Sequence, residues 1–169
     1  QRKIYNSYLL FKPGQNVIPP SPSINSKMKL VPFSEYFPYE KYFPHIYKSL
    51  LEYEKFFLDP GSDIAIFDSQ GLSIYSPICF ENTFPQLCTI AWKKGARSLF
   101  CLVSDAWSKS LSCQYQHLAM AKFRAVEEGL PVIRVPNYSA GNIGGSVISV
   151  IGNSIDGKIV DGKDGFNGI

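Results

Sequence analysis

Residues 98–104 read Ser-Leu-Phe-Cys-Leu-Val-Ser, a continuous apolar run with a polar residue at each end. Such a run is typical of a β-strand that is buried on both faces of a sheet. The segment 114–128 that follows carries apolar residues on one helical stripe and ends at Gly-Leu-Pro, which predicts a helix. Residues 131–136 predict a further strand. Strands and helices that alternate in this way favour an α/β layered fold.

The segments before this core predict a hairpin and a capped helix. Residues 63–68 and 72–80 read as two strands joined by a tight turn at 69–71. A helix is predicted over residues 82–94, because Asn82 is a good N-cap, two lysines occupy the last turn and a glycine follows. Hairpins beside buried strands indicate a mixed sheet rather than a purely parallel one.

The two ends of the chain contribute further predicted elements. Residues 4–11 predict a strand, residues 12–26 a proline-rich loop, and residues 46–57 a helix. Near the C-terminus, residues 145–151 and 158–160 predict a terminal hairpin. The length of 169 residues is about that of one domain.

The composition disfavours several functional classes. The chain has 17 Lys and Arg against 14 Asp and Glu, and a net charge of +3 is far from the dense basic patch of a nucleic-acid-binding protein. The longest unbroken apolar run, at 99–103, has five residues, whereas a membrane-spanning helix needs about 20. The chain begins with Gln1 and shows no signal peptide, so we expect a piece of a longer protein.

Aromatic residues are unusually clustered. The chain has 12 Phe, 10 Tyr and 2 Trp, and ten of these residues lie between Phe33 and Phe57. Prolines at positions 38 and 44 interrupt the stretch. We expect part of this cluster to be ordinary core.

The cysteines do not form a metal-binding pattern. The four cysteines include no Cys-x-x-Cys pair, and the two histidines are far apart in the sequence, which disfavours a zinc site. A chain with a good core does not require disulfides, and Cys88 and Cys101 lie in apolar runs where a free cysteine behaves as a small hydrophobe. We therefore expect no zinc site.

Candidate functional residues lie where predicted strands end, which is where open α/β sheets bind ligands. Cys79 lies between a strand and a capped helix, where a helix N-terminus favours a nucleophilic thiolate. The alternative is one more buried core cysteine. Ser104, Asp105 and Trp107 follow the most buried strand, and residues 137–145 form a loop rich in Gly, Asn and Ser. The alternative for the first segment is a polar turn in which Asp105 caps a helix. For residues 137–145 the composition favours a loose loop over a ligand-binding one.

Two charged residues lie further upstream. Glu35 lies among aromatic residues, where a carboxylate is held protonated or needs a cation. Lys27, eight residues earlier, is expected from its spacing alone to be solvated. The sequence has no Gly-x-Ser-x-Gly elbow, phosphate-binding loop or dinucleotide fingerprint, which disfavours serine hydrolases, nucleotidases and dehydrogenases.

Several segments together carry a family resemblance. Residues 27–36 read Lys-Met-Lys-Leu-Val-Pro-Phe-Ser-Glu-Tyr, residues 78–81 read Ile-Cys-Phe-Glu, and residues 103–107 read Val-Ser-Asp-Ala-Trp. They are followed by Gln-His-Leu-Ala-Met-Ala at 116–121, Arg-Ala-Val-Glu at 124–127, and the stretch 131–137. In their residues and in their order along the chain these segments resemble the nitrilase (carbon-nitrogen hydrolase) superfamily and, within it, the bacterial apolipoprotein N-acyltransferases.

The resemblance implies a fold and a set of catalytic residues. The fold is a nitrilase-like α-β-β-α layered sandwich with mixed sheets, of which residues 1–169 form a partial, N-terminally truncated domain without its first strands and upstream membrane helices. The family uses a Glu-Lys-Cys triad, in which Cys79 is the nucleophile and Lys27 stabilises the oxyanion, while Glu35 and Glu81 support the site. The triad glutamate is expected upstream of residue 5. The residues implied to bind substrate are Phe80, Ser104, Asp105 and Trp107.

The implied reaction takes an acyl chain from a membrane phospholipid onto Cys79 as a thioester and passes it to the N-terminal amine of a diacylglyceryl-cysteine apolipoprotein. The resemblance places the domain on the periplasmic face of the cell inner membrane, with no metal, cofactor or nucleic acid. The aromatic stretch then suits a lid that faces the membrane. The implied lid residues are Tyr36, Phe37, Tyr39, Tyr42 and Phe43.

The sequence departs from the family pattern at a few positions. Phe80 and Ser104 stand where Tyr and Asn are usual, and Lys29 and Ser34 replace His and Gly. Two alternatives stay open: a soluble nitrilase-type amidase, and a non-catalytic remnant of a split or degenerate acyltransferase gene. We expect His117, a lone histidine on a helix, to be structural.

Overall fold

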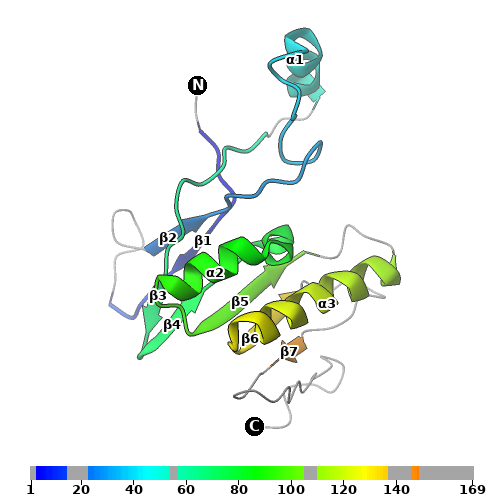
Figure 1. Cartoon of the computed structure of the whole chain (residues 1–169). Coiled ribbons are helices and arrows are strands. Elements are labelled where there is room, and N and C mark those ends of the chain that lie inside the picture. Colours follow the sequence, from blue (N-terminus) through cyan, green and yellow to red (C-terminus); the bar gives the residue numbers. More distant parts are fainter. Residues whose placement is uncertain (1–2, 15–22, 54–56, 105–109, 137–145, 149–169) are drawn as a thin grey trace.

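Figure 1 shows the computed structural model, which describes residues 3–14, 23–53, 57–104, 110–136 and 146–148. In this part of the chain, strands β1 (Ser7–Leu10) and β2 (Ser23–Ser26) form a small antiparallel sheet. Strand β2 corrects the prediction of a loop over residues 12–26. Its sequence, Ser-Ile-Asn-Ser, has little strand propensity of its own, so pairing with β1 and not local preference makes it a strand.

A larger sheet carries most of the core. In the described residues it has the strand order β3-β4-β5-β6-β7. The middle strands β4, β5 and β6 run parallel, while β3 and β7 pair antiparallel at the two edges, which confirms the prediction of a mixed sheet. The strands are β3 (Phe67–Ser69), β4 (Leu72–Tyr75), β5 (Ser98–Val103), β6 (Val132–Pro136) and β7 (Ser146–Ile148).

The predicted hairpins have different outcomes. Strands β3 and β4 form a hairpin through Gln70 and Gly71, which both have positive φ, as the type I′ turn of a two-residue loop requires. At the C-terminal end, β7 pairs with β6. The second half of the predicted terminal hairpin, residues 158–160, lies outside the described residues.

Helices α2 (Pro85–Lys93) and α3 (Leu111–Glu128) lie on the same face of the larger sheet (Figure 1). The prediction that Asn82 caps α2 is wrong: the N-cap is Phe84, because a proline at N1 starts the helix there. Asn82 lies buried in a short 3-10 helix, η1 (Cys79–Thr83). Helix α3 begins three residues earlier than expected, since the Ser110 side chain accepts a hydrogen bond from the Cys113 N–H.

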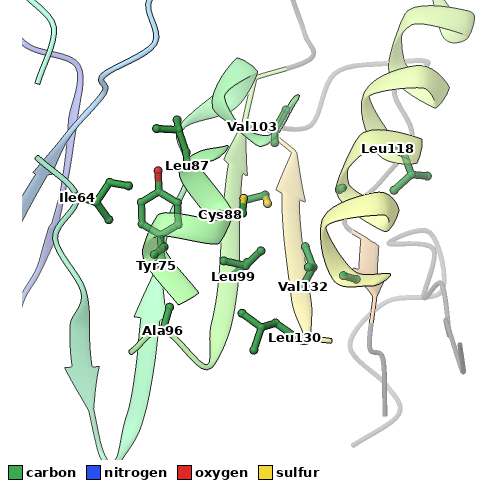
Figure 2. Close-up of a cluster of buried hydrophobic side chains, with 14 residues drawn as sticks. Ile64, Tyr75, Leu87, Cys88, Ala96, Leu99, Val103, Leu118, Leu130 and Val132 are labelled. Carbon is green, nitrogen blue, oxygen red and sulfur yellow. The ribbon is translucent and has the colours of Figure 1, made fainter. Parts of the chain in front are cut away.

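The hydrophobic core lies between these two helices and the parallel strands (Figure 2). Helix α2 contributes Leu87 and Cys88, and β5 contributes Leu99. Small residues on the inner stripe of α3 let that helix lie close to the sheet. The other core residues from these elements are Tyr75, Ala91, Cys101, Val103, Leu118, Ala121, Ala125 and Val132. Among the described helices, none is both long enough and apolar enough to cross a membrane.

Residues 36–53 and residue 57, which together we call the arm, extend away from both sheets (Figure 1). The arm contains α1 (Pro44–Tyr53), which starts two residues before the predicted helix. Its base is closed where the Leu58 N–H donates to the Glu35 carbonyl at 2.8 Å. Tyr47 stacks on Phe57 and on Phe37, with ring centroids 5.5 and 6.4 Å apart. The aromatic stretch is therefore a separate projection and only partly a core.

Candidate active site

Cys79 lies where the chain leaves the larger sheet. The preceding residue, Ile78, forms an isolated parallel bridge with Leu102 of β5, and η1 begins at Cys79 itself. Cys79 has a φ of +52°, in the left-handed region, which costs a residue with a side chain about 1–3 kcal/mol. Its half-exposed Sγ lies 4.0 Å from the carbonyl oxygen of Ser104. This sharp turn presents the thiol at the carboxyl edge of the parallel strands.

The helix that follows Cys79 is not the long capped helix expected from the sequence. The strand–helix junction is present, but the helix that follows directly is the five-residue η1, and α2 starts only at Pro85. The dipole of a long helix therefore does not begin at the thiol. A strained backbone, and not the N-terminus of α2, distinguishes Cys79 from an ordinary core cysteine.

Lys27 follows β2 and is buried, with a side chain that is 0% exposed. The expectation of a solvated lysine is wrong, because the Nζ forms an ion pair with Glu35 Oε1 at 2.7 Å. The backbone of Lys27 is held by the Asn6 carbonyl at 2.8 Å and by the Gly61 N–H at 2.7 Å. A side chain at Gly61 would place its Cβ 2.3 Å from the Ser26 carbonyl oxygen, so only glycine allows this close approach.

Glu35 is the ion-pair partner of Lys27, and this pair supplies the cation that a carboxylate among aromatic residues needs. Its side chain is 17% exposed, and while Oε1 binds Lys27, Oε2 accepts the N–H of Val31 at 2.8 Å. The second contact closes the turn between Val31 and Glu35 and fixes the carboxylate. Lys27 is thus a positive charge held in one orientation in a nearly dry environment, where its field is stronger than at the surface.

Glu81 joins the lysine segment to the thiol segment. Its Oε2 accepts the N–H of Ile78, the residue before Cys79, at 2.8 Å. Its Oε1 accepts the N–H groups of Met28 and Lys29, which follow Lys27, at 2.7 and 3.1 Å. Because these are charge-assisted bonds to a buried carboxylate, one side chain sets the relative position of two backbone segments that are far apart in the sequence.

We expect the substitution Glu81→Gln to loosen this junction. A glutamine can still accept from Met28 and Lys29, but its NH2 group would then face the Ile78 N–H, donor against donor. The expected result is a loss of about 2 kcal/mol of stability and a 10- to 100-fold slower reaction of the thiol with acyl donors. Thermal unfolding and acyl-enzyme kinetics measure the two effects. The matched control is Asp68→Asn on the exposed side of β3, which should change neither; an unchanged Glu81→Gln variant would contradict the bridging role.

A cavity of about 960 Å³ lies between this site and the base of the arm. Its walls include Met28 and Lys29 from the lysine segment, and Phe80 from η1. From the arm side they include Tyr36 and Phe37. Phe80 packs edge-on against Phe84, which also lines the cavity, with ring centroids 5.2 Å apart. The charged residues of the lining are Lys3, Lys29, Glu40 and Asp59, and the other walls are mostly apolar, so the cavity can accept an apolar chain.

The other residues that were predicted to bind substrate or to form a lid lie in different places. Ser104 contributes its carbonyl near the thiol. Asp105, Trp107 and the loop 137–145 lie outside the described residues. Of the expected lid residues, Tyr36 and Phe37 line the cavity, whereas those further along the arm point to solvent. The solvent-exposed lid residues are Tyr39, Tyr42 and Phe43.

The structure adds one residue that the sequence left as structural. His117 on α3 lies with its Nε2 3.1 Å from the carbonyl oxygen of Cys79. The signal for this residue in the sequence was its place in the Gln-His segment that carries the family resemblance. The sequence alone does not show that a helix residue contacts a backbone carbonyl 38 positions away. Within the described residues no three His, Cys, Asp or Glu side chains converge on a possible metal site.

The other cysteines differ from Cys79 in their surroundings. Burial raises the pKa of the Cys88 thiol to about 12, and burial also raises the pKa of Cys101. All four cysteines are free thiols. Cys88 and Cys101 are inert core residues, as predicted, while Cys79 and Cys113 are half-exposed.

Comparisons with known proteins place this geometry in context. The carbon-nitrogen hydrolase family model matches residues 1–160. Apolipoprotein N-acyltransferase 1 of Treponema pallidum is 42% identical over 95% of this chain and 28% of its own length. Apolipoprotein N-acyltransferase 1 of Treponema denticola is 47% identical over 79% of this chain and 25% of its own length. The chain therefore spans about a quarter of the length of these curated relatives.

Solved structures agree on the fold. Nit3 of Saccharomyces cerevisiae, a member of the nitrilase superfamily, has a TM-score of 0.58 at 19% identity and covers 94% of this chain and 48% of its own. A carbon-nitrogen hydrolase of Helicobacter pylori has a TM-score of 0.57 at 19% identity and covers 92% of this chain and 54% of its own. Both similarities concern the arrangement of the mixed α/β elements.

Proposed function

The chain belongs to the carbon-nitrogen hydrolase family and is homologous to apolipoprotein N-acyltransferases, and on that premise we propose that it carries the thiol site of such an acyltransferase. In this proposal Cys79 accepts an acyl chain from a phospholipid and passes it to the N-terminal amine of a lipid-modified apolipoprotein. The observation that carries the proposal is Glu81, whose carboxylate binds the backbone on the lysine side and on the thiol side.

The proposed reaction has two halves, and each passes through an oxyanion that a nearby positive charge stabilises. The Cys79 thiolate attacks the ester carbonyl, and the tetrahedral oxyanion forms near the ammonium of Lys27. Collapse breaks the ester C–O bond, a proton goes to the departing lysophospholipid alkoxide, and a thioester remains. The amine nitrogen then attacks the thioester carbonyl, the C–S bond breaks as the amide forms, and the proton that the amine loses goes to the departing Cys79 thiolate. The family resemblance implies that a glutamate is the base that first deprotonates Cys79.

The cavity beside the site is the proposed binding place for the acyl chain. Its apolar walls from Met28, Phe80 and Phe37 suit a hydrocarbon, and its charged lining consists of two lysines, Lys3 and Lys29, and two carboxylates, Glu40 and Asp59. Lys29 lies over the ring of Phe84, 5.8 Å from its centroid, so its charge is held beside the apolar wall. We also propose that the chain forms part of one layered α-β-β-α domain, as the resemblance implies.

The arm is the proposed contact with the membrane. Its exposed aromatic residues include Tyr42, 78% exposed, and the neighbouring Phe33 is 65% exposed. Exposed Lys41 and Lys48 lie among them. Aromatic and basic residues in one projection suit the lipid–water interface, which supports a location at the cell inner membrane. The remaining exposed aromatic or aliphatic residues of the arm are Tyr39, Phe43 and Ile46.

We expect the substitutions Phe37→Ser and Phe43→Ser to weaken the reaction with membranes selectively. The double variant should be about tenfold slower with vesicle-borne phospholipid, since each lost aromatic contact at the interface removes apolar burial, and less affected with a soluble acyl thioester. Phe43→Ser alone separates the two roles, because Phe43 is exposed on the arm and does not line the cavity. The matched control is Phe123→Ser on exposed α3. Equal losses on both donors would indicate that the aromatic cluster is ordinary core and does not contact the membrane.

The function itself is tested with phospholipid labelled in its acyl chain. The intact protein should acquire a label that neutral hydroxylamine releases, and should pass it to a synthetic peptide with an N-terminal diacylglyceryl-cysteine. Release of ammonia from small amides without this label would favour an amidase. A protein that folds but takes no label from either substrate class would be a non-catalytic relative.

A further inference from the structure

One helix, α3, holds the turn that carries the nucleophile, and we propose that His117 on this helix is a positioning residue for acyl transfer. The inference rests on the proposed function of Cys79 as the nucleophile. His117 touches no reacting atom in this scheme. It binds the carbonyl of Cys79 and thereby fixes the peptide group between Cys79 and Phe80.

The hydrogen bond to the Cys79 carbonyl shows which ring nitrogen of His117 carries a hydrogen. A backbone carbonyl oxygen only accepts hydrogen bonds, so at 3.1 Å the Nε2 must carry the hydrogen and donate it. Both the neutral tautomer with Nε2–H and the imidazolium ion meet this condition.

The turn needs such a contact because its first residue is strained. Cys79 adopts a φ of +52°, which a residue with a side chain keeps only when its surroundings hold it there. Helix α3 provides two contacts, at the two ends of η1. His117 binds the Cys79 carbonyl, and Arg124 Nη1 donates to the Thr83 carbonyl at 3.4 Å while Nη2 binds Glu127 at 2.8 Å.

The helix that makes these contacts is itself rigidly packed. Between His117 and Arg124 the inner stripe of α3 carries Leu118 and Ala121, which are buried against the sheet. Since α3 is fixed to the sheet, η1 can shift relative to the sheet only if its hydrogen bonds to His117 and Arg124 break. This makes α3 a fixed support from which the orientation of the nucleophile can be set.

The fixed peptide group has a direct consequence for the oxyanion. In a planar trans peptide the C=O and the following N–H point to opposite sides, so the Phe80 N–H points away from α3. As the second residue of a 3-10 helix, Phe80 has no acceptor for this N–H within its own turn. A backbone N–H beside a nucleophile is a typical donor to an oxyanion. By holding the Cys79 carbonyl, His117 sets the direction of that donor.

The test compares two reactions of the same thiol in the intact protein. Acylation by p-nitrophenyl butyrate passes through an oxyanion, whereas alkylation by iodoacetamide displaces iodide and forms none. For His117→Met we expect acylation of Cys79 to slow about 100-fold and alkylation to change less than threefold. His117→Gln, of similar size but with an amide N–H, should keep acylation within about fivefold of the wild type. Mass spectrometry of the Cys79 peptide measures both rates, and Gln116→Leu on the exposed side of α3 is the matched control.

Several results would overturn the inference. Acylation and alkylation that fall together in His117→Met would indicate general disorder of the turn, and so would a Gln variant as slow as the Met variant at equal melting temperature. Unchanged acylation in His117→Met would remove the role altogether. Because neither reagent is a lipid, the expected pattern in a protein that takes no acyl chain from phospholipid would support the role of His117 and contradict only the proposed function.

Discussion

Replacing Cys79 by alanine is expected to abolish the acyl-enzyme and to lower acyl transfer by at least about 10⁴-fold, because the Cys79 thiol carries the acyl group in the proposed reaction. Labelled phospholipid and hydroxylamine release measure this loss. The melting temperature of Cys79→Ala should be close to that of the wild type, since alanine bears the same left-handed backbone strain. Cys79→Gly should be equally inactive but should gain up to about 1 kcal/mol, because glycine adopts a φ of +52° without a side-chain clash.

The other half-exposed cysteine provides the control for this result. Cys113→Ala should retain acyl transfer, and iodoacetamide applied to the wild type should modify Cys79 and Cys113 while sparing Cys88 and Cys101, whose pKa values burial raises. A hydroxylamine-sensitive label that survives in Cys79→Ser would show that the nucleophile is another residue.

The fold was predictable where the signal is local. The apolar run at 98–104 became β5, and the Gly-Leu-Pro sequence ended α3 at Gly129, whose φ of +61° favours glycine. Strand β2 was not predictable, because its four residues become a strand only by pairing with β1. The break between η1 and α2 was also missed, since Asn82 is a good N-cap by type but is buried in the turn.

The site was predictable only in part for the same physical reason. Glu35 among aromatic residues predicted either a protonated carboxylate or a cation partner, and the ion pair with Lys27 is the second of these, but the spacing did not show that Lys27 supplies the cation. The three backbone N–H groups on Glu81 come from two segments about 50 positions apart, as the separations of 52 and 53 residues show. No short pattern contains such a contact. The family resemblance placed these residues together before the geometry explained why they belong together.

The second large effect is expected at Lys27. The substitution Lys27→Met keeps the length of the side chain but removes a buried positive charge beside the proposed oxyanion. We expect acyl-enzyme formation to fall about 10³-fold, as for the loss of an oxyanion donor. Stability should also fall, by about 3 kcal/mol, because Glu35 keeps its charge in a largely buried place without its cation. Chemical denaturation and single-turnover acylation measure the two losses.

A double variant separates the catalytic loss from the structural one. In Lys27→Met with Glu35→Gln the uncompensated charge is gone, and the amide of the new glutamine can still accept the Val31 N–H. Its stability should therefore recover by most of the lost free energy, while acylation stays about 10³-fold slow because no cation faces the oxyanion. If acylation recovered together with stability, Lys27 would serve only to neutralise Glu35, and the charge that stabilises the oxyanion would have to come from another part of the protein. Lys27→Arg sharpens this distinction, since it keeps the charge but has a planar head that does not match the single contact to Oε1 of Glu35; it should be slow in acylation despite the retained charge.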